Sequence, residues 1–174
     1  ENVQIDGTFM SVGDLFSFRN DEVFVEFEDQ NGNDREDIDI LAEEVTVIER
    51  GGTDFQTKAV FVTGDDRRVV PVAPFGQDSS GDDLDPEAFF DRALSSGGNI
   101  NFDKEILENS LNGTIFPEKG QLYLFEFFRE DGTNNYALML ITYTDEYGFA
   151  FRYAKATKTR PEISFGGGVV KDKI

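Results

Sequence analysis

The chain contains no cysteine, no histidine and no tryptophan among its 174 residues. Without cysteine it has no disulfide framework, no thiolate metal site and no thiol nucleophile. Without histidine it lacks the commonest metal ligand and general base, and every catalytic device that pairs serine or cysteine with histidine. These absences exclude the common hydrolase and redox classes, and we expect a protein that is not an enzyme.

Long apolar runs are also missing. A helix that crosses a bilayer needs about 18 or more consecutive apolar residues, and no such run occurs. No signal peptide is visible, and the chain opens at Glu1 with polar residues. We expect an extracellular or outer-surface-anchored protein whose export signal has been removed.

Positive charge is scarce, with 16 basic against 35 acidic residues and a net charge of −19. Residues 1–50 hold 15 acidic and three basic side chains, whereas residues 151–174 hold two acidic and six basic ones. Such a surface argues against nucleic acid and against anionic membranes as partners. It suits a solvated surface or weak binding of divalent cations.

What the chain does contain predicts one β-rich domain over residues 1–174. Hydrophobic residues make up 39% of it, and 18 of them are phenylalanine, which suits the faces of sheets. Alternating apolar residues predict a half-buried strand over Glu22–Glu28. Further strands are predicted at Glu44–Glu49, Lys58–Val62 and Arg67–Val72.

One or two short helices are predicted within residues 86–111. Asp85 can cap the first, Pro86 suits its first turn, and Gly97 with Gly98 would end it. Asp103 is placed to cap a second short helix. The remainder of the fold is expected to be antiparallel sheet.

The last third predicts an antiparallel meander of three strands, Gln121–Arg129, Asn135–Thr144 and Tyr147–Ala156. In the third strand Phe149 and Phe151 share a face with two tyrosines, while small residues share the other face with Arg152. We expect the aromatic face to back the core and the small face to receive a helix or second sheet. The tail after Glu162 is expected to be a loose terminus or an edge strand.

Two stretches resemble HmuY-like proteins, which are haem-binding surface lipoproteins of Bacteroidetes-type bacteria. Asp37–Gly52 looks like a family segment with an aspartate and apolar pair followed by a glycine pair. Gly120–Tyr153 resembles the family's closing unit, with Asp131-Gly132, then Tyr136–Tyr143, then Gly148–Tyr153. The order and rough spacing agree over about two thirds of the chain.

The resemblance implies a single HmuY-like all-β domain on the cell surface. It implies capture of haem or another small hydrophobic ligand, or of a surface partner protein. Two features depart from the family: no tryptophan precedes Asp39, and the histidine pair that ligates haem cannot exist here. Some relatives use methionine instead, so ligation without histidine is the form of haem binding to consider.

Candidate haem ligands are then few. Met10 and Met139 carry the only sulfur atoms, and two thioethers could hold the iron if they faced one pocket. Met139 nevertheless lies in an apolar strand, where a core role is the default. Tyr143 and Tyr147 are further candidate ligands, with an ordinary sheet role as the alternative.

Candidate calcium ligands lie in the acidic stretch after residue 28. Asp29, Asn31 and Asn33 place oxygen side chains at alternate positions, as Ca²⁺ prefers, although the spacing is not that of an EF-hand. Asn31 with Gly32 is equally a hairpin turn. The alternative function is therefore a calcium-stabilised structural or adhesive module, or a non-catalytic accessory module of a glycan system.

Overall fold

The computed structural model describes residues 7–48, 51–52, 55–95, 97–128, 133–157 and 162–166. These residues form antiparallel sheets with two short helices, which confirms the predicted mostly-β fold class. The elements in chain order are β1 Thr8–Ser11, β2 Leu15–Ser17, β3 Glu22–Phe24, β4 Ile40–Ile48, β5 Phe55–Thr63, β6 Arg68–Val72, α1 Pro86–Leu94, β7 Asn99–Asp103, the 3-10 helix η1 Lys104–Asn109, β8 Leu122–Phe128, β9 Asn134–Thr144, β10 Gly148–Lys155 and β11 Glu162–Gly166.

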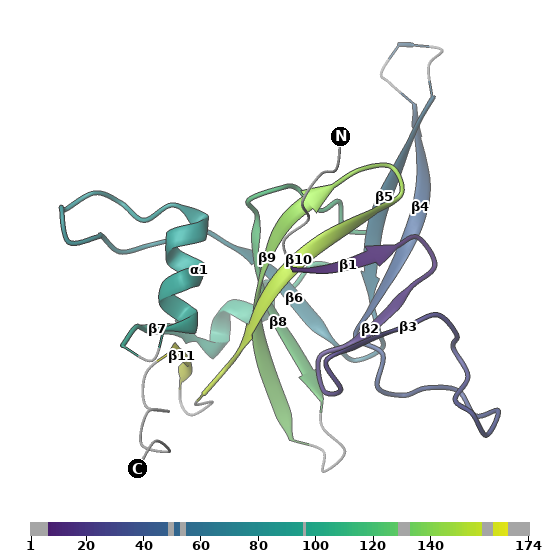
Figure 1. Cartoon of the computed structure of the whole chain (residues 1–174), viewed down its shortest axis with the longest axis horizontal. Coiled ribbons are helices and arrows are strands. Elements are labelled where there is room, and N and C mark those ends of the chain that lie inside the picture. The colour runs from purple at the N-terminus through teal and green to yellow at the C-terminus, as the bar shows by residue number, and fades with distance from the viewer. Residues whose placement is uncertain are drawn as a thin grey trace.

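The elements form three layers (Figure 1). The central layer is a five-stranded sheet in the order β1-β10-β9-β8-β6. One of its faces packs against a four-stranded sheet in the order β3-β2-β4-β5. Its other face packs against α1, η1 and the two-stranded β11-β7 sheet. No helix in the described part of the chain is long and apolar enough to cross a membrane.

Strand β9 lies in the middle of the central sheet, and residues 136–141 are buried one after another. Their side chains point alternately to the two faces, so both faces must be covered by other elements. Leu138 contributes to the core beside α1, and Met139 to the core between the two sheets. The continuous apolar sequence of β9 is therefore explained by layers on both sides, and the predicted meander is confirmed.

Two separate cores result. The sheet–sheet core consists of Met10, Phe16, Phe18, Ile40, Ala42, Phe61, Val69, Ile115, Tyr123, Phe125, Phe127, Ala137, Met139, Ile141, Phe149 and Phe151. The helix-side core consists of Val70, Val72, Leu84, Phe89, Phe90, Ala93, Ile100, Phe102, Leu107, Leu122, Leu124, Tyr136, Leu138, Leu140, Ala154, Ile163 and Phe165. Each core buries apolar surface against one face of the same sheet, so the central sheet joins them.

Strand β10 bears out the prediction made for its two faces. Phe149 and Phe151 are fully buried in the sheet–sheet core, and the ring of Phe16 meets that of Phe151 edge to face at 5.1 Å. On the other face Ala154 packs in the helix-side core, and the Arg152 guanidinium lies 4.8 Å from the ring centre of Phe90 in α1. The small face therefore receives a helix, as expected.

The predicted helix signals are also in place. The Asp85 side chain accepts a hydrogen bond of 2.7 Å from the Ala88 amide at the start of α1. Asp103 accepts from the Glu105 amide at 3.0 Å and caps η1, which is a 3-10 rather than an α-helix. The tail forms β11, an edge strand paired with β7, and residues 167–174 lie outside the described part.

The strand predicted over Glu22–Glu28 is wrong in its second half. β3 ends at Phe24, and the side chains of Val25 and Phe27 are 76% and 57% exposed. The alternating pattern needs a partner strand to cover it, but among the described residues β3 pairs with β2 alone, and β2 has three residues. Beyond β3 the chain turns instead, and the Arg35 amide donates to the Phe27 carbonyl at 2.8 Å.

Strands β4 and β5 form the longest hairpin, and only one half of it is covered. Ala42 and Phe61, paired across the hairpin, are buried in the sheet–sheet core. Farther along, the cross-strand pair Ile48 and Phe55 is 59% and 67% exposed. We call residues 44–48 of β4 with residues 55–58 of β5 the arm; it extends beyond the body of the molecule (Figure 1).

Candidate functional site

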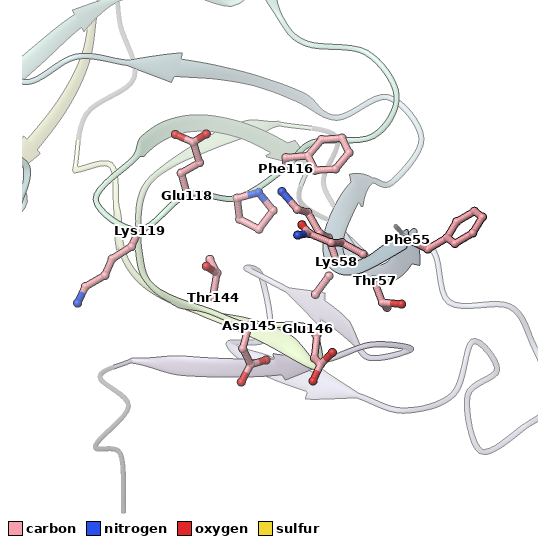
Figure 2. A pocket seen from close by; sticks show the side chains of 12 residues that line it. Phe55, Thr57, Lys58, Phe116, Glu118, Lys119, Thr144, Asp145 and Glu146 are labelled. Carbon is pink, nitrogen blue, oxygen red and sulfur yellow. The ribbon is translucent and has the colours of Figure 1, made fainter. Parts of the chain in front are cut away.

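A groove of about 720 Å³ lies between the arm and one end of the central sheet. Its first wall is the start of β5, residues 55–59. The second wall is the segment Phe116–Lys119, and the third is the β9–β10 turn with Thr144, Asp145 and Glu146 (Figure 2). Three segments that are far apart in the chain therefore surround one hollow.

The β5 wall is the edge of a strand rather than its face. Alternate side chains of a strand point to opposite faces, so a ligand on one face would contact every second residue. Here five consecutive residues, 55–59, line the groove. The groove therefore runs along an edge of β5, toward which backbone N–H and C=O groups point, and not over the face of the strand.

The neighbouring pair shows which of these backbone groups point into the groove. The Phe61 amide donates to the Ile115 carbonyl at 3.0 Å, and the Ile115 amide donates to the Phe61 carbonyl at 2.8 Å. Along an antiparallel strand these groups alternate in direction, so those of Ala59, Thr57 and Phe55 point the same way as those of Phe61. No backbone group of a described residue pairs with them. Pro117, which has no N–H, follows two residues after Ile115, where the chain leaves the strand.

The turn that forms the third wall is held by one carboxylate. Asp145 Oδ1 accepts hydrogen bonds from the amides of Tyr147 at 2.8 Å and Gly148 at 3.0 Å, and Oδ2 accepts from the Tyr143 hydroxyl at 2.8 Å. This hydrogen bond is the main cause that raises the pKa of Tyr143 above its ordinary value. A Cβ on Gly148 would lie 2.1 Å from the Met10 carbonyl oxygen, so β1 packs directly against the turn.

The groove has an aromatic rim and charges of both signs. Phe55 is 67% exposed and Phe116 is 46% exposed. Neither Lys58 nor Lys119 has an ion-pair partner among the described residues, while Glu118 and Glu146 supply negative charge. A ligand here would meet two large apolar rings, open backbone groups and charges of either sign, which is the composition of a binding site for an amphipathic ligand.

The two methionines predicted as haem ligands lie elsewhere. Met10 and Met139 are both fully buried in the sheet–sheet core. Neither lines the groove described above nor the second hollow described below. Both thioethers therefore have a packing role in the structure, which for Met139 was the stated alternative.

The two tyrosines lie at the β9–β10 turn beside the groove without lining it. Tyr147 is 69% exposed, whereas Tyr143 is half-buried and its ring lies 6.3 Å from that of Phe9. A hydrogen bond with Glu146 is the main cause that raises the pKa of Tyr147. An iron ligand would be the deprotonated phenolate, so this shift works against ligation.

The oxygen side chains predicted to bind calcium form a hairpin loop. Asp29 Oδ1 accepts from the amides of Asn31 at 2.8 Å and Asn33 at 3.0 Å, and Gly32 has a φ of 79°. The acidic loop after Gln77 repeats this arrangement: Asp78 Oδ1 accepts from Ser80 at 2.8 Å and from Asp82 at 3.0 Å. The part of the chain that the structure describes contains no group of three or more acidic side chains arranged to hold a metal ion.

Two ion pairs that each contain a buried carboxylate lie away from the groove. Asp39 is 1% exposed and accepts from Arg67 Nε at 2.8 Å and from the Phe18 amide at 2.7 Å. Burial raises the pKa of Asp39 despite these hydrogen bonds. Glu126 accepts from Arg68 at 2.5 and 2.9 Å. Burial raises its pKa, but the hydrogen bonds to the carboxylate, led by those from Arg68, and the charge of Arg68 together outweigh burial, so the net pKa is lowered.

A second hollow, of about 1070 Å³, lies on the outer face of the four-stranded sheet. Its arginines are already engaged in the fold. Arg67 donates to the carbonyl oxygens of Asp65 and Glu36, and Arg35 lies 3.8 Å from the ring centre of Phe24 and donates to the Glu26 carbonyl. Since these cations hold the surrounding loops, the groove beside the arm is the better candidate site.

No residue type or spacing in the sequence predicted a site at the residues that form this groove. Phe55 follows the hairpin turn and Phe116 precedes Pro117, and neither position has a pattern that indicates exposure. One signal was present: a proline after an apolar pair marks a point where a segment stops pairing.

Comparison of the chain with family models, curated proteins and solved structures finds no match. The resemblance to HmuY-like proteins therefore stays a prediction, based on the order of short motifs. In the structure these motifs are the segment around Asp39 and the β8–β9–β10 meander.

Proposed function

We propose that this chain is a non-catalytic ligand-binding domain that works outside the cell and captures its ligand in the groove beside the arm. The observation that carries this proposal is the pair of exposed rings, Phe55 and Phe116, which line one groove from two different walls. Large apolar side chains gathered at a hollow are typical of interaction sites, whereas single exposed ones need no explanation.

The acidic composition and the absence of cysteine and histidine are compatible with this function. A binding domain needs shape, apolar area and a few polar groups, all of which the groove supplies. It needs no general base or metal.

The location of the site is tested with an amphipathic fluorescent dye, an anilinonaphthalene sulfonate. We expect the double variant Phe55→Ala/Phe116→Ala to lose most of the dye fluorescence. Val25→Ala is the matched control, because Val25 is 76% exposed but lies outside the groove. Equal dye binding by the double variant and the wild type would contradict the proposed site.

Haem is the candidate ligand that the family resemblance implies, and titration followed by absorbance tests it directly. A Soret shift at micromolar haem that is lost in Tyr147→Phe would assign the iron to the exposed turn. Absence of any shift, in both oxidised and reduced samples, would remove haem and leave the groove as a site for another ligand.

A further inference from the structure

We infer that the ligand of the groove is an extended polypeptide segment, which adds to β5 as a new strand of the four-stranded sheet. This inference deepens the proposed function and rests on it, because it names the class of ligand that the same groove takes. The occupant is a segment of another protein, with apolar residues and net positive charge.

β5 lies at the edge of its sheet. The sheet order is β3-β2-β4-β5, so among the described strands β5 has a neighbour on one side only. A free strand edge is a template for pairing, and proteins that bind peptides by strand addition use such an edge.

The chain already uses this edge of β5 at one point. Ile115 pairs with Phe61 through two hydrogen bonds of 2.8 and 3.0 Å in antiparallel geometry. The open groups of Ala59, Thr57 and Phe55 continue the same line of donors and acceptors into the groove. A bound segment would therefore extend a pairing that one residue of the chain has begun.

The groove around this edge has room for a further strand. Phe116 and Pro117 follow directly after Ile115 and line the groove together with residues 55–59 of β5. Thr144, Asp145 and Glu146 of the β9–β10 turn line the same space (Figure 2). The β5 wall is five residues long, which corresponds to roughly 17 Å of extended chain. The groove thus fits a segment of about five residues, with side chains on one face directed to the aromatic rim.

The charge of the whole chain selects among possible segments. Within the groove Lys58 and Lys119 lie among three carboxylates, those of Glu118, Asp145 and Glu146, so the local formal charge is weakly negative. At longer range the net charge of −19 attracts a basic segment and repels a second copy of this chain. A basic, apolar segment of a different protein is therefore favoured over self-association.

A random octapeptide library selected on the wild-type protein tests the inference. We expect selected peptides to carry net positive charge and to lose about tenfold or more in affinity for Thr57→Pro, which removes an open N–H that β4 does not use. Thr57→Val is the matched control, because it keeps the N–H, and it should bind as the wild type does.

A second measurement is independent of how the proline variant folds. Peptides are N-methylated at alternate backbone amides, in two complementary sets. One set removes the donors that face β5 and should abolish binding, while the other set should leave binding intact.

The outcomes separate the inference from the proposed function. Peptides that bind but respond to neither Thr57→Pro nor either methylation set would overturn strand addition and leave the groove as a site. A library that yields no binder would overturn the peptide class, while the dye experiment still tests the groove. A wild-type dimer that Thr57→Pro converts to a monomer would assign the edge to a second copy and overturn the partner named here.

Discussion

The two halves of the β4–β5 hairpin share one pairing register but differ in what covers them. In the covered half Ala42 and Phe61 pack against the central sheet and are 1% and 0% exposed. In the arm Ile48 and Phe55 continue the same faces and are more than half exposed. Stability and the proposed recognition are therefore divided along one element, since the covered half contributes buried area and the arm supplies an open edge.

The sharpest test of this division compares two phenylalanines. Phe151→Ala should lower the free energy of unfolding by about 3–5 kcal/mol, because the ring is fully buried in the sheet–sheet core. Phe55→Ala on the arm should change it by less than about 0.5 kcal/mol. Urea unfolding measures both. A similar loss in the two variants would show that the arm is part of the core and remove the distinction.

Hydrogen exchange should show the division at the level of single amides. The Phe61 amide donates to Ile115 and should exchange only through large opening. The Thr57 amide points to the open edge and should exchange on the order of 10² times faster or more. Exchange followed by NMR checks this, and binding of a selected peptide should then slow the Thr57 amide. Equal protection in the free protein would mean that the edge is already paired.

A third test compares a buried carboxylate with an exposed one on the arm and predicts that stability depends on pH. Glu126 is 2% exposed; burial raises its pKa, but the hydrogen bonds to the carboxylate, led by those from Arg68, and the charge of Arg68 together lower it below the ordinary value of 4.5. The stabilisation by the charged form is therefore present above pH 4.5 and is lost as the pH falls through the lowered pKa. Glu126→Gln should cost about 1–3 kcal/mol at pH 7 and less in acid.

The matched control is Glu44→Gln on the arm, where the side chain is exposed and the effect should stay within about 0.5 kcal/mol. Denaturant unfolding of both variants over the acid range provides the measurement. A gap between wild type and Glu126→Gln that widens in acid would show that the sign of the pKa shift is wrong.

The smallest effect is expected from calcium. The Asp29 carboxylate already accepts two backbone amides, so its loop should hold its shape without a metal ion. Thermal melts in millimolar calcium and in chelator should give the same midpoint, since a ligand that does not bind cannot stabilise. A midpoint several degrees higher with calcium, lost in Asp29→Ala, would instead favour the calcium-stabilised module.

The parts of the fold that could be predicted are those in which the pattern and the partner are close in sequence. Strands β8, β9 and β10 follow each other through short turns, and the alternation of Phe149 and Phe151 with small residues indicates two covered faces. The cap at Asp85 is likewise local. Strands β1 and β7 were missed because they are short and become strands only by pairing with distant segments, as Met10 does opposite Phe149. β2 was missed because its three residues are too few to show an alternating pattern.

The candidate site could not be predicted from the sequence for the same reason. Its walls come from residues 55–59, 116–119 and 144–146, which only the sheet order brings together. The residues that the sequence did indicate, Met10 and Met139, are chemically distinctive, but they lie in the core. The candidates were chosen because their residue types are rare in the chain. Whether a candidate is exposed to solvent depends on its position in the fold.

The order of strands in the central sheet also has a consequence for how the protein folds. The β8–β9–β10 meander is built from hairpins whose partners are neighbours in the chain, so little loop entropy opposes its formation. β1 must join from the opposite end of the chain to pair with β10. We therefore expect the meander to form the folding nucleus, with β1 closing the sheet late, so that substitutions in β1 speed unfolding more than they slow refolding.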